Sequence, residues 1–215
     1  MKYKIAFLDE SNQWLNTFYH SFKKDFEVEL VKIDGTVEID KLISDLFEKE
    51  LDAIVTDYLL EEEGNVAFNG NLIVDTIRNQ RPHFPLIMLT AHQSQAINHM
   101  DDVHIIYGKE ILDGESDDEL KLFKTKINSN IEHYYSKLTN TRTRIEQLSA
   151  KKNSESLEMT EEDELTRLLI LMDEFEPEGK DMPANLILPA SITKLNEFVT
   201  ETRALLQELK NQNKK

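Results

Sequence analysis

The first half of the chain alternates short apolar runs with longer segments in which apolar residues recur every three or four positions. The short runs are typical of β-strands and lie at Lys4–Leu8, Phe26–Ile33, Ala53–Val55, Leu86–Leu89 and Val103–Ile106. The intervening segments predict helices over about Asn12–Phe22, around Leu42–Phe47, from near Asn71 and over Gln93–His99. Because the central runs are continuously apolar, we expect helices on both faces of the sheet. The pattern therefore predicts an α/β fold with a doubly wound, five-stranded parallel sheet.

The second half changes to long helical patterns, starting at about Asp117. Its apolar positions step by four and three along one seam, which contains Ile127, Ile131, Tyr134, Leu138, Thr141, Ile145 and Leu148. We predict one α/β domain over residues 1–125 and an all-α extension over residues 126–215. The last helix of the domain continues into the extension, and two further helices follow it.

Breaks in the pattern divide this extension. Residues 153–156 end the long helix, and Thr160 is a candidate N-cap for the second helix. Residues 177–189 contain three prolines and predict a connection, after which Ser191 can cap a third helix. The apolar seams have to be buried, either in a helical hairpin or bundle or in a dimeric coiled coil. We expect the extension to combine homodimer formation with binding of a partner protein.

Polar residues follow four of the predicted strands. Asp9 and Glu10 come after the first strand, Asp57 after the third, Thr90 after the fourth and Lys109 after the fifth. The carboxyl ends of parallel strands meet at one edge of an open sheet, where ligand sites form. Three carboxylates, one hydroxyl and one amine at this edge suit Mg²⁺ and a phosphoryl group.

Each of these residue types has a role in phosphoryl transfer. Asp57 can supply a nucleophilic carboxylate, Lys109 can pair with a phosphoryl oxygen, and the hydroxyl of Thr90 can donate to another. The oxygen ligands that Mg²⁺ prefers are available from Asp9, Glu10, Asp57 and the backbone carbonyl of Leu59. The predicted site therefore has Asp57, Thr90 and Lys109 as its catalytic residues beside this set of metal ligands.

The ordered set resembles the receiver domain of two-component response regulators over about residues 1–125. Receivers carry an acidic pair, a phosphoacceptor aspartate, a Thr or Ser followed by Ala, and a lysine. The matching residues are Asp9-Glu10, Asp57, Thr90-Ala91 and Lys109. The resemblance implies a flavodoxin-like receiver fold that binds Mg²⁺ and accepts a phosphoryl group on Asp57. It also implies a histidine kinase or phosphotransfer protein as donor and a downstream protein effector.

Three features depart from the family pattern. Glu110 stands where many receivers have a proline. The usual aromatic switch position is Ile106, and Tyr107, one residue later, is expected on the other face of a regular strand. The loop over residues 61–69 is long and acidic, and the glycine before the next helix is Gly70. This loop either tunes Mg²⁺ affinity, partner choice or dephosphorylation, or is a solvated insertion.

Composition narrows the possible partners and compartments. The 215 residues carry a net charge of -16, which opposes binding to a phosphate backbone, and they include no cysteine. The lack of cysteine excludes disulfides, thiolate zinc sites and cysteine nucleophiles. No run approaches the roughly 18 apolar residues of a membrane helix, and the N-terminus lacks a secretory pattern. We therefore expect a cytoplasmic protein without nucleic-acid or membrane partners.

Three functional hypotheses follow from these observations. The first is a response regulator that catalyses only its own phosphorylation and dephosphorylation and signals through protein contacts of its helical extension. The alternative is an unphosphorylated pseudo-receiver that acts as a constitutive assembly module, which the missing proline and displaced aromatic favour. A Mg²⁺-dependent phosphohydrolase is weaker, because such enzymes usually carry a second acid where this chain has Leu59.

Overall fold

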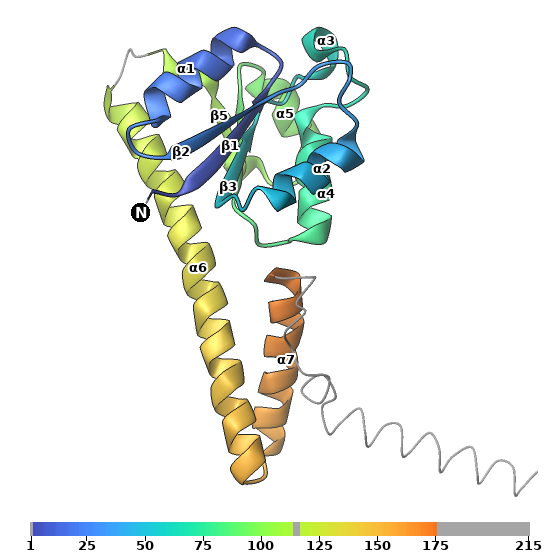
Figure 1. The fold of residues 1–215 in the computed structure, drawn as a ribbon, viewed down its shortest axis with the longest axis vertical. Helices are drawn as coiled ribbons and strands as arrows, with labels where there is room; N and C mark the ends of the chain where they lie inside the picture. The colour runs from blue at the N-terminus through green and yellow to red at the C-terminus, as the bar shows by residue number, and fades with distance from the viewer. Residues whose placement is uncertain (1, 114–116, 176–215) are drawn as a thin grey trace, which may run out of the picture. The chain divides into compact units, whose positions relative to one another are not determined.

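The computed structural model describes residues 2–113 and 117–175. The chain divides into two compact units, Met1–Lys137 and Leu138–Lys215, and the boundary falls inside one long helix. The first unit contains the sheet, and the described part of the second unit is helical (Figure 1). The predicted connection over residues 177–189 and the helix predicted after Ser191 lie outside the described residues.

A parallel sheet forms the centre of the first unit. Its strands are β1 (Lys4–Asp9), β2 (Glu27–Lys32), β3 (Ala53–Thr56), β4 (Leu86–Thr90) and β5 (Ile106–Gly108). They are arranged in the order β2-β1-β3-β4-β5, and each neighbouring pair is parallel. This order is the doubly wound, flavodoxin-like one, so the predicted fold class is confirmed.

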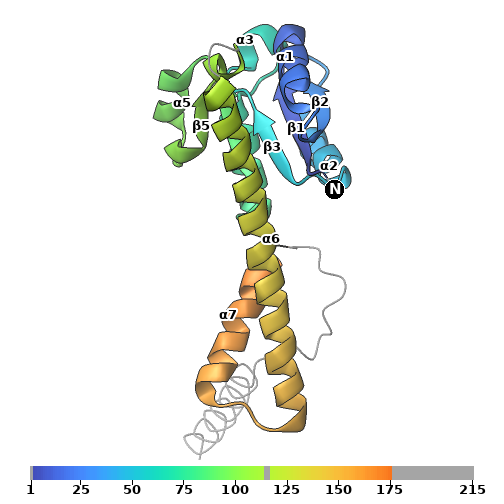
Figure 2. The ribbon, with the colours of Figure 1, turned by 90° about the vertical axis from the view of Figure 1, so that its left-hand side faces the viewer.

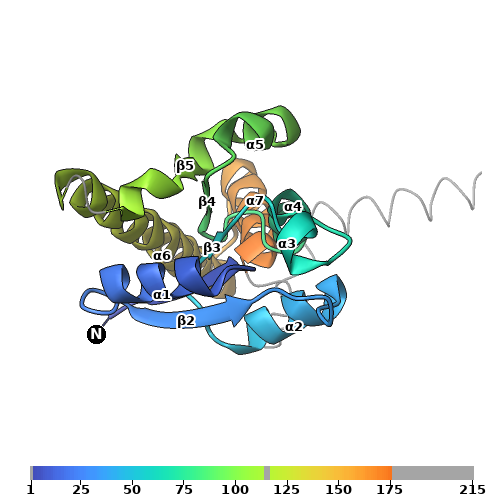
Figure 3. The same ribbon diagram turned by 90° about the horizontal axis from the view of Figure 1, so that it is seen from above.

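Helices cover both faces of the sheet, which explains its continuously apolar strands. Helix α1 (Asn12–Phe22) and the first part of α6 (Asp117–Ser154) pack on one face. Helices α2 (Ile39–Glu48), α4 (Gly70–Gln80) and α5 (Gln93–His99) contribute to the core on the other (Figure 3). Successive strand residues point to opposite faces, and both of these faces are buried.

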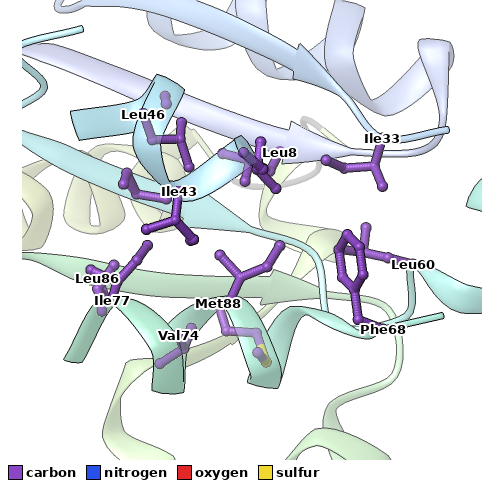
Figure 4. Packing of buried hydrophobic residues seen from close by; sticks show 14 of the residues in the cluster. Leu8, Ile33, Ile43, Leu46, Leu60, Phe68, Val74, Ile77, Leu86 and Met88 are labelled. Atoms are coloured by element: carbon purple, nitrogen blue, oxygen red, sulfur yellow. The ribbon is translucent and has the colours of Figure 1, made fainter. Parts of the chain in front are cut away.

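Alternate residues of the strands accordingly belong to two separate cores. In β1, Ile5 and Phe7 pack with α1 and α6, whereas Ala6 and Leu8 pack with α2 and α4. Figure 4 shows the second core, where the side chain of Leu8 lies among those of α2 and α4. All four of these β1 residues are completely buried.

The fifth strand begins later than predicted. Val103–Ile105 form a short 3₁₀ turn, η1, and β5 starts at Ile106. Asp102 holds this turn, because its carboxylate accepts from the backbone N–H of His104 at 3.1 Å and pairs with Arg78 at 2.6 Å. The fifth strand is present, but its predicted extent over Val103–Ile105 was wrong because apolarity alone does not reveal this cap.

Buried apolar side chains anchor the acidic loop to the core of the sheet unit. The loop contains the one-turn helix α3 (Glu61–Gly64), which follows the buried side chain of Leu60. The side-chain oxygen of Asn69 accepts from the backbone N–H groups of Leu60 and Glu61, both at 3.0 Å. The buried side chains of Val66 and Phe68 fix the rest of the loop to the core.

The first part of α6 belongs to the sheet unit as far as its two tyrosines. Ile127 and Ile131 are fully buried in the core shared with α1. Further along, the ring of Tyr134 meets that of Phe84 at 6.0 Å between centroids, and the hydroxyl of Tyr135 donates to Asp52. The predicted continuation of this helix beyond the domain core is thus anchored on the sheet unit before it passes into the second unit.

The second unit contains the end of α6 and α7 (Met159–Phe175), which form a helical hairpin (Figures 1 and 2). Arg144 makes two bonds of 2.8 Å to the carboxylate of Glu164, and Lys151 pairs with Glu161 at 2.6 Å. The buried side chains are Leu138, Thr141, Ile145, Leu148, Leu165, Met172 and Phe175. Of the two predicted arrangements, the hairpin is present within this single chain.

The start of α7 corrects one predicted cap. Thr160 lies inside the helix, and Glu158 precedes its first residue. The backbone N–H of Glu158 donates to the Glu161 carboxylate at 3.0 Å, and the Glu158 carbonyl accepts from two N–H groups of the first turn. This is the reciprocal part of a capping box; it displaces the N-cap by two residues from Thr160.

None of the described helices combines the length and hydrophobicity of a membrane span.

Candidate functional site

The structure brings the five predicted side chains to the same edge of the sheet. Asp9 is the last residue of β1 and Thr90 the last of β4, whereas Asp57 and Lys109 directly follow β3 and β5. Glu10 comes next after Asp9. These strands are neighbours in the sheet order. β5 ends at Gly108, so Lys109 is the first residue after it.

Lys109 is the centre of this group. Its ammonium nitrogen lies 2.7 Å from Asp9 Oδ2 and 2.8 Å from Asp57 Oδ2, and all three side chains are buried. Burial by itself lowers the pKa of Lys109, but the negative charges of Asp57 and Asp9 outweigh it, and the net shift is upward. Lys109 is therefore a firmly charged ammonium that joins the ends of β1, β3 and β5.

Asp57 is oriented by the backbone around it. Its Oδ1 accepts from the N–H of Tyr58 at 2.7 Å, which leaves Oδ2 directed at Lys109. The carbonyl of Tyr58 accepts from the N–H of Gly70 at 2.7 Å, so the start of α4 is pressed against the end of β3. A Cβ atom at Gly70 would lie 1.8 Å from the carbonyl oxygen of Asp57, and only glycine fits there.

Three carboxylates form a group whose chemistry suits a divalent cation. One oxygen each from Asp9, Glu10 and Asp57 lie within 4.8 Å of one another. Glu10 Oε2 is buried and has no hydrogen-bond partner among the residues that the structure describes. Three carboxylates and one ammonium leave two net negative charges when all are ionised, which a divalent ion would balance. These residues fit Mg²⁺, which prefers carboxylate oxygens.

The pKa values of Glu10 and Asp9 reflect their burial and the nearby charges. Burial and, next, the charge of Asp9 raise the pKa of Glu10 to about 7. Burial also raises the pKa of Asp9, although Lys109 and the N–H of Ser11, which donates to Asp9 Oδ1 at 2.8 Å, act in the opposite direction. Without a cation, Glu10 and Asp9 therefore retain their protons to higher pH than isolated carboxylates do.

The remaining predicted residues lie beside this group. Thr90 is fully buried, and its hydroxyl oxygen accepts from the N–H of His92 at 3.1 Å. Leu59 lies two residues after Asp57, and its half-buried side chain packs against the core of α2 and α4. Its backbone carbonyl as a metal ligand stays a prediction.

The structure also shows which way Ile106 and Tyr107, the residues at and beside the usual aromatic position, face. Ile106 packs against the core of α2 and α4, whereas Tyr107 packs against the core of α1 and α6. The ring of Tyr107 lies 4.9 Å from that of Phe123. The expectation that these two residues face opposite sides of the strand is confirmed.

Sequence reasoning did not identify Trp14 and Gln93 beside the site, nor the contact that Glu110 makes. The ring of Trp14, on α1, lies 5.1 Å from the ammonium of Lys109, within the range of a cation–π interaction. Its spacing from Leu15 and Phe18 along α1 indicates only an apolar helix face. Gln93 donates to the carboxylate of Glu110 at 2.9 Å. No local pattern pairs these two residues, because they are 17 positions apart.

Comparisons with known proteins found similarity only among solved structures. No protein-family model and no curated protein match the sequence. Among solved structures, the chain is similar to the signal receiver domain of an HD domain-containing protein from Pseudomonas fluorescens Pf-5, with 18% identity and a TM-score of 0.48. That match covers 63% of this chain and 90% of the other.

Two further structures of this kind are similar. For the chemotaxis response regulator CheY4 of Vibrio cholerae, the identity is 17% and the TM-score 0.44, over 59% of this chain and 99% of the other. For a response regulator receiver protein from Sinorhizobium medicae WSM419, the values are 19% and 0.42, over 61% and 95%. At identities this low the similarity concerns the fold alone. The doubly wound architecture of this chain is established by the order of the strands in its own sheet.

Proposed function

We propose that this protein is a phosphorylation-dependent response regulator. It accepts a phosphoryl group on Asp57 from a histidine kinase or phosphotransfer protein and signals through protein contacts of its helical region. The observation that carries the proposal is the pairing of Lys109 with two buried carboxylates, at 2.7 and 2.8 Å, beside a third carboxylate, that of Glu10, whose buried Oε2 lacks a hydrogen-bond partner within the described part of the chain. A structural ion pair does not require that third, half-buried acid.

Asp57 is the acceptor in this proposal. A carboxylate oxygen attacks the phosphorus of a phosphohistidine, so that an oxygen–phosphorus bond forms as the nitrogen–phosphorus bond breaks. The electron pair of the broken bond stays on the imidazole nitrogen of the donor. The N–H of Tyr58 and the ammonium of Lys109 hold the carboxylate in one orientation before the attack, which removes the need to order it during the reaction.

Lys109 and Thr90 act on the phosphoryl group once it is attached. Lys109 is firmly protonated, so it can exchange its contact with Asp57 for one with a phosphoryl oxygen and keep Asp9 as its second partner. The hydroxyl of Thr90 can rotate and donate to another phosphoryl oxygen. Asp9, Glu10 and Asp57, with the backbone carbonyl of Leu59, would hold Mg²⁺, which supplies charge neutralisation for the transferred group.

The helical region is the output of the proposed regulator. α6 packs on the sheet unit through fully buried side chains such as Ile127 and Ile131, and the same helix then forms one arm of the hairpin. The net charge of -16 opposes contact with nucleic acid. We propose that the output is a protein partner, reached through a homodimer, and that the protein works in the cytoplasm.

The test is intact-mass measurement after incubation with acetyl phosphate and Mg²⁺. We expect one added phosphoryl group in the parent protein, none in Asp57→Asn, and none in the parent when a chelator is present. Asp113→Asn removes an exposed carboxylate near the site and should behave like the parent. An adduct that persists in Asp57→Asn would contradict the assignment of the acceptor.

A second candidate function is a constitutive assembly module that is not phosphorylated. The packing of Tyr107 on Phe123 favours it, because an aromatic side chain fixed in that core is not available on the other face of the strand. This candidate predicts no mass adduct with acetyl phosphate and no change of the protein's thermal stability with beryllofluoride and Mg²⁺.

A further inference from the structure

Two side chains connect the segment that begins at Lys109 with the end of the short loop after Thr90, residues 91–92, which we call the Thr90 loop. Gln93 is the first residue of α5, three positions after Thr90, and Glu110 directly follows Lys109. The amide nitrogen of Gln93 donates to Glu110 Oε1 at 2.9 Å. We refer to this contact as the Gln93–Glu110 bridge.

The position of the Glu110 carboxylate depends on a glycine. A Cβ atom at Gly108 would lie 1.9 Å and 2.0 Å from the two carboxylate oxygens of Glu110. The carboxylate therefore occupies the space beside Gly108 that any other residue would fill. The backbone of Gly108 has a φ of -82° and a ψ of 142°, which other residues adopt readily. The glycine thus makes room for the carboxylate, and the backbone itself does not require it.

The order of the strands determines toward which side the bridge holds the Thr90 loop. β4 lies between β3 and β5, so the Thr90 loop, which follows β4, has Asp57 on one side and Glu110 on the other. A hydroxyl that moves toward a phosphoryl group on Asp57 carries its loop toward β3. The bridge holds the same loop toward β5. An interaction that is made in the free state and weakened in the phosphorylated state opposes the switch by its own free energy.

We propose that Gln93 and Glu110 are positioning residues that restrain the Thr90 loop in the unphosphorylated state and so set how readily the site accepts a phosphoryl group. This inference rests on the proposed function. It explains why a charged residue follows Lys109 at a site that already carries three carboxylates. Loss of the bridge frees the loop and raises the affinity of the site for a phosphoryl analogue.

The experiment measures the dissociation constant of beryllofluoride in the presence of Mg²⁺ for the full chain and its variants. Glu110→Ala, Gln93→Ala and Gly108→Ala break the bridge in three different ways, and each should bind about fivefold more tightly, as expected for one exposed hydrogen bond. Gly108→Ala is the sharpest of the three, because it displaces the carboxylate without removing its charge. The double variant Gln93→Ala with Glu110→Ala should gain nothing further.

Two controls separate positioning from charge. Glu110→Gln keeps a carbonyl oxygen that can accept from Gln93 and should bind like the parent. Asp113→Ala removes a nearby exposed charge and should also bind like the parent. Equal tightening in Glu110→Ala and Glu110→Gln, or additive effects in the double variant, would overturn the proposal, because the charge of Glu110 would then be the cause.

Hydrogen exchange without Mg²⁺ tests the bridge independently of phosphorylation. Amides of residues 91–96 should exchange faster in Glu110→Ala and Gly108→Ala than in the parent and in Glu110→Gln. If the parent fails to bind beryllofluoride, the proposed function and its regulation both fall, and the exchange rates still decide whether the bridge restrains the loop. If the parent binds and the bridge variants match it in both measurements, only the inference is overturned.

Discussion

At the scale of single residues, the site is a balance between buried negative charge and one ammonium. Lys109 satisfies two carboxylates directly, and the third, Glu10, has a pKa raised to about 7 by burial and by Asp9. Removing one partner of a buried pair leaves an uncompensated charge. The ionised, metal-free site therefore lowers the stability of the folded protein, and binding of a cation or a proton reverses this effect.

Substitution of Glu10 by glutamine should stabilise the metal-free protein at alkaline pH. The pKa of Glu10 is about 7 in the folded protein against 4.5 for an unperturbed glutamate. Ionisation is therefore less favourable in the folded state, and Glu10 lowers the free energy of unfolding as pH rises from about 4.5 through 7. We expect Glu10→Gln to have a higher melting temperature than the parent at pH 8 and a similar one at pH 5, measured by calorimetry with a chelator.

The exposed residue Glu48 supplies the matched control. Glu48→Gln should leave the melting temperature unchanged at both pH values. A stabilisation by Glu10→Gln that is the same at pH 5 and pH 8 would show that ionisation of Glu10 is not its source.

Mg²⁺ should stabilise the parent protein more at pH 8 than at pH 6. At pH 6 most Glu10 side chains are protonated, and the cation has to displace that proton. Thermal unfolding at a fixed Mg²⁺ concentration measures the effect, and a chelator should reverse it. An increase in melting temperature that is independent of pH would exclude Glu10 from the ligands.

At the scale of elements, the site depends on how closely helices approach the ends of strands. The clearest case is Gly70, whose hydrogen atom takes the place of a Cβ that would lie 1.8 Å from the carbonyl oxygen of Asp57. The one-turn helix α3 is a second case, because a Cβ atom at Gly64 would lie 3.3 Å from the Cβ of Glu10. The acidic loop therefore borders the carboxylate group.

Gly70→Ala should both destabilise the protein and impair the site. The added methyl group has to push α4 away from the end of β3, which costs about 1–3 kcal/mol of unfolding free energy. Urea denaturation measures this loss, and phosphoryl incorporation from acetyl phosphate should fall with it. Asn79→Ala, at an exposed position of the same helix, should change neither; a neutral Gly70→Ala would contradict the close packing.

Ile131→Ala should weaken the attachment of α6 to the sheet unit. The side chain is fully buried, and truncation of such a residue costs about 2–5 kcal/mol. We expect the loss in urea denaturation together with faster hydrogen exchange in residues 124–136. Glu132→Ala, at the adjacent exposed position, is the control and should unfold like the parent.

At the scale of the whole molecule, the chain joins a sheet unit with its own two cores to a helical hairpin with its own buried seam. One helix, α6, belongs to both. The hairpin is held by apolar contacts and by two ion pairs at its surface, Arg144 with Glu164 and Lys151 with Glu161. Ion pairs at a protein surface contribute little because water and salt screen them, so the apolar seam is the main source of stability of the hairpin.

Leu148→Ala should loosen the hairpin and leave the phosphoryl chemistry intact. Leu148 is almost completely buried, and its loss should accelerate hydrogen exchange across residues 138–175. The stoichiometry of phosphoryl incorporation should match that of the parent, because the site belongs to the other unit. Glu146→Ala, at an exposed position, should show parent-like exchange. Loss of incorporation in Leu148→Ala would show that the site depends on the hairpin.

The sequence alone determined the elements and the candidate site. Continuous apolar runs followed by Asp9, Asp57, Thr90 and Lys109 indicated both the strands and the edge at which these residues meet, because strand ends and polar residues are local features. The long seam of α6 was equally evident, because helical periodicity is local as well. The exact limits of β5 and the cap of α7 escaped, since both depend on side chains such as Asp102 and Glu161 that act through particular hydrogen bonds.

Only the tertiary structure decided what surrounds those residues. The ring of Trp14 beside Lys109, the Gln93–Glu110 bridge and the approach of Gly70 to Asp57 join positions that are far apart along the chain. The raised pKa of Glu10 has the same origin, because desolvation depends on everything that packs around a carboxylate. Local patterns select the chemical groups of a site, whereas their distances, burial and protonation follow from packing between elements that the sequence order does not bring together.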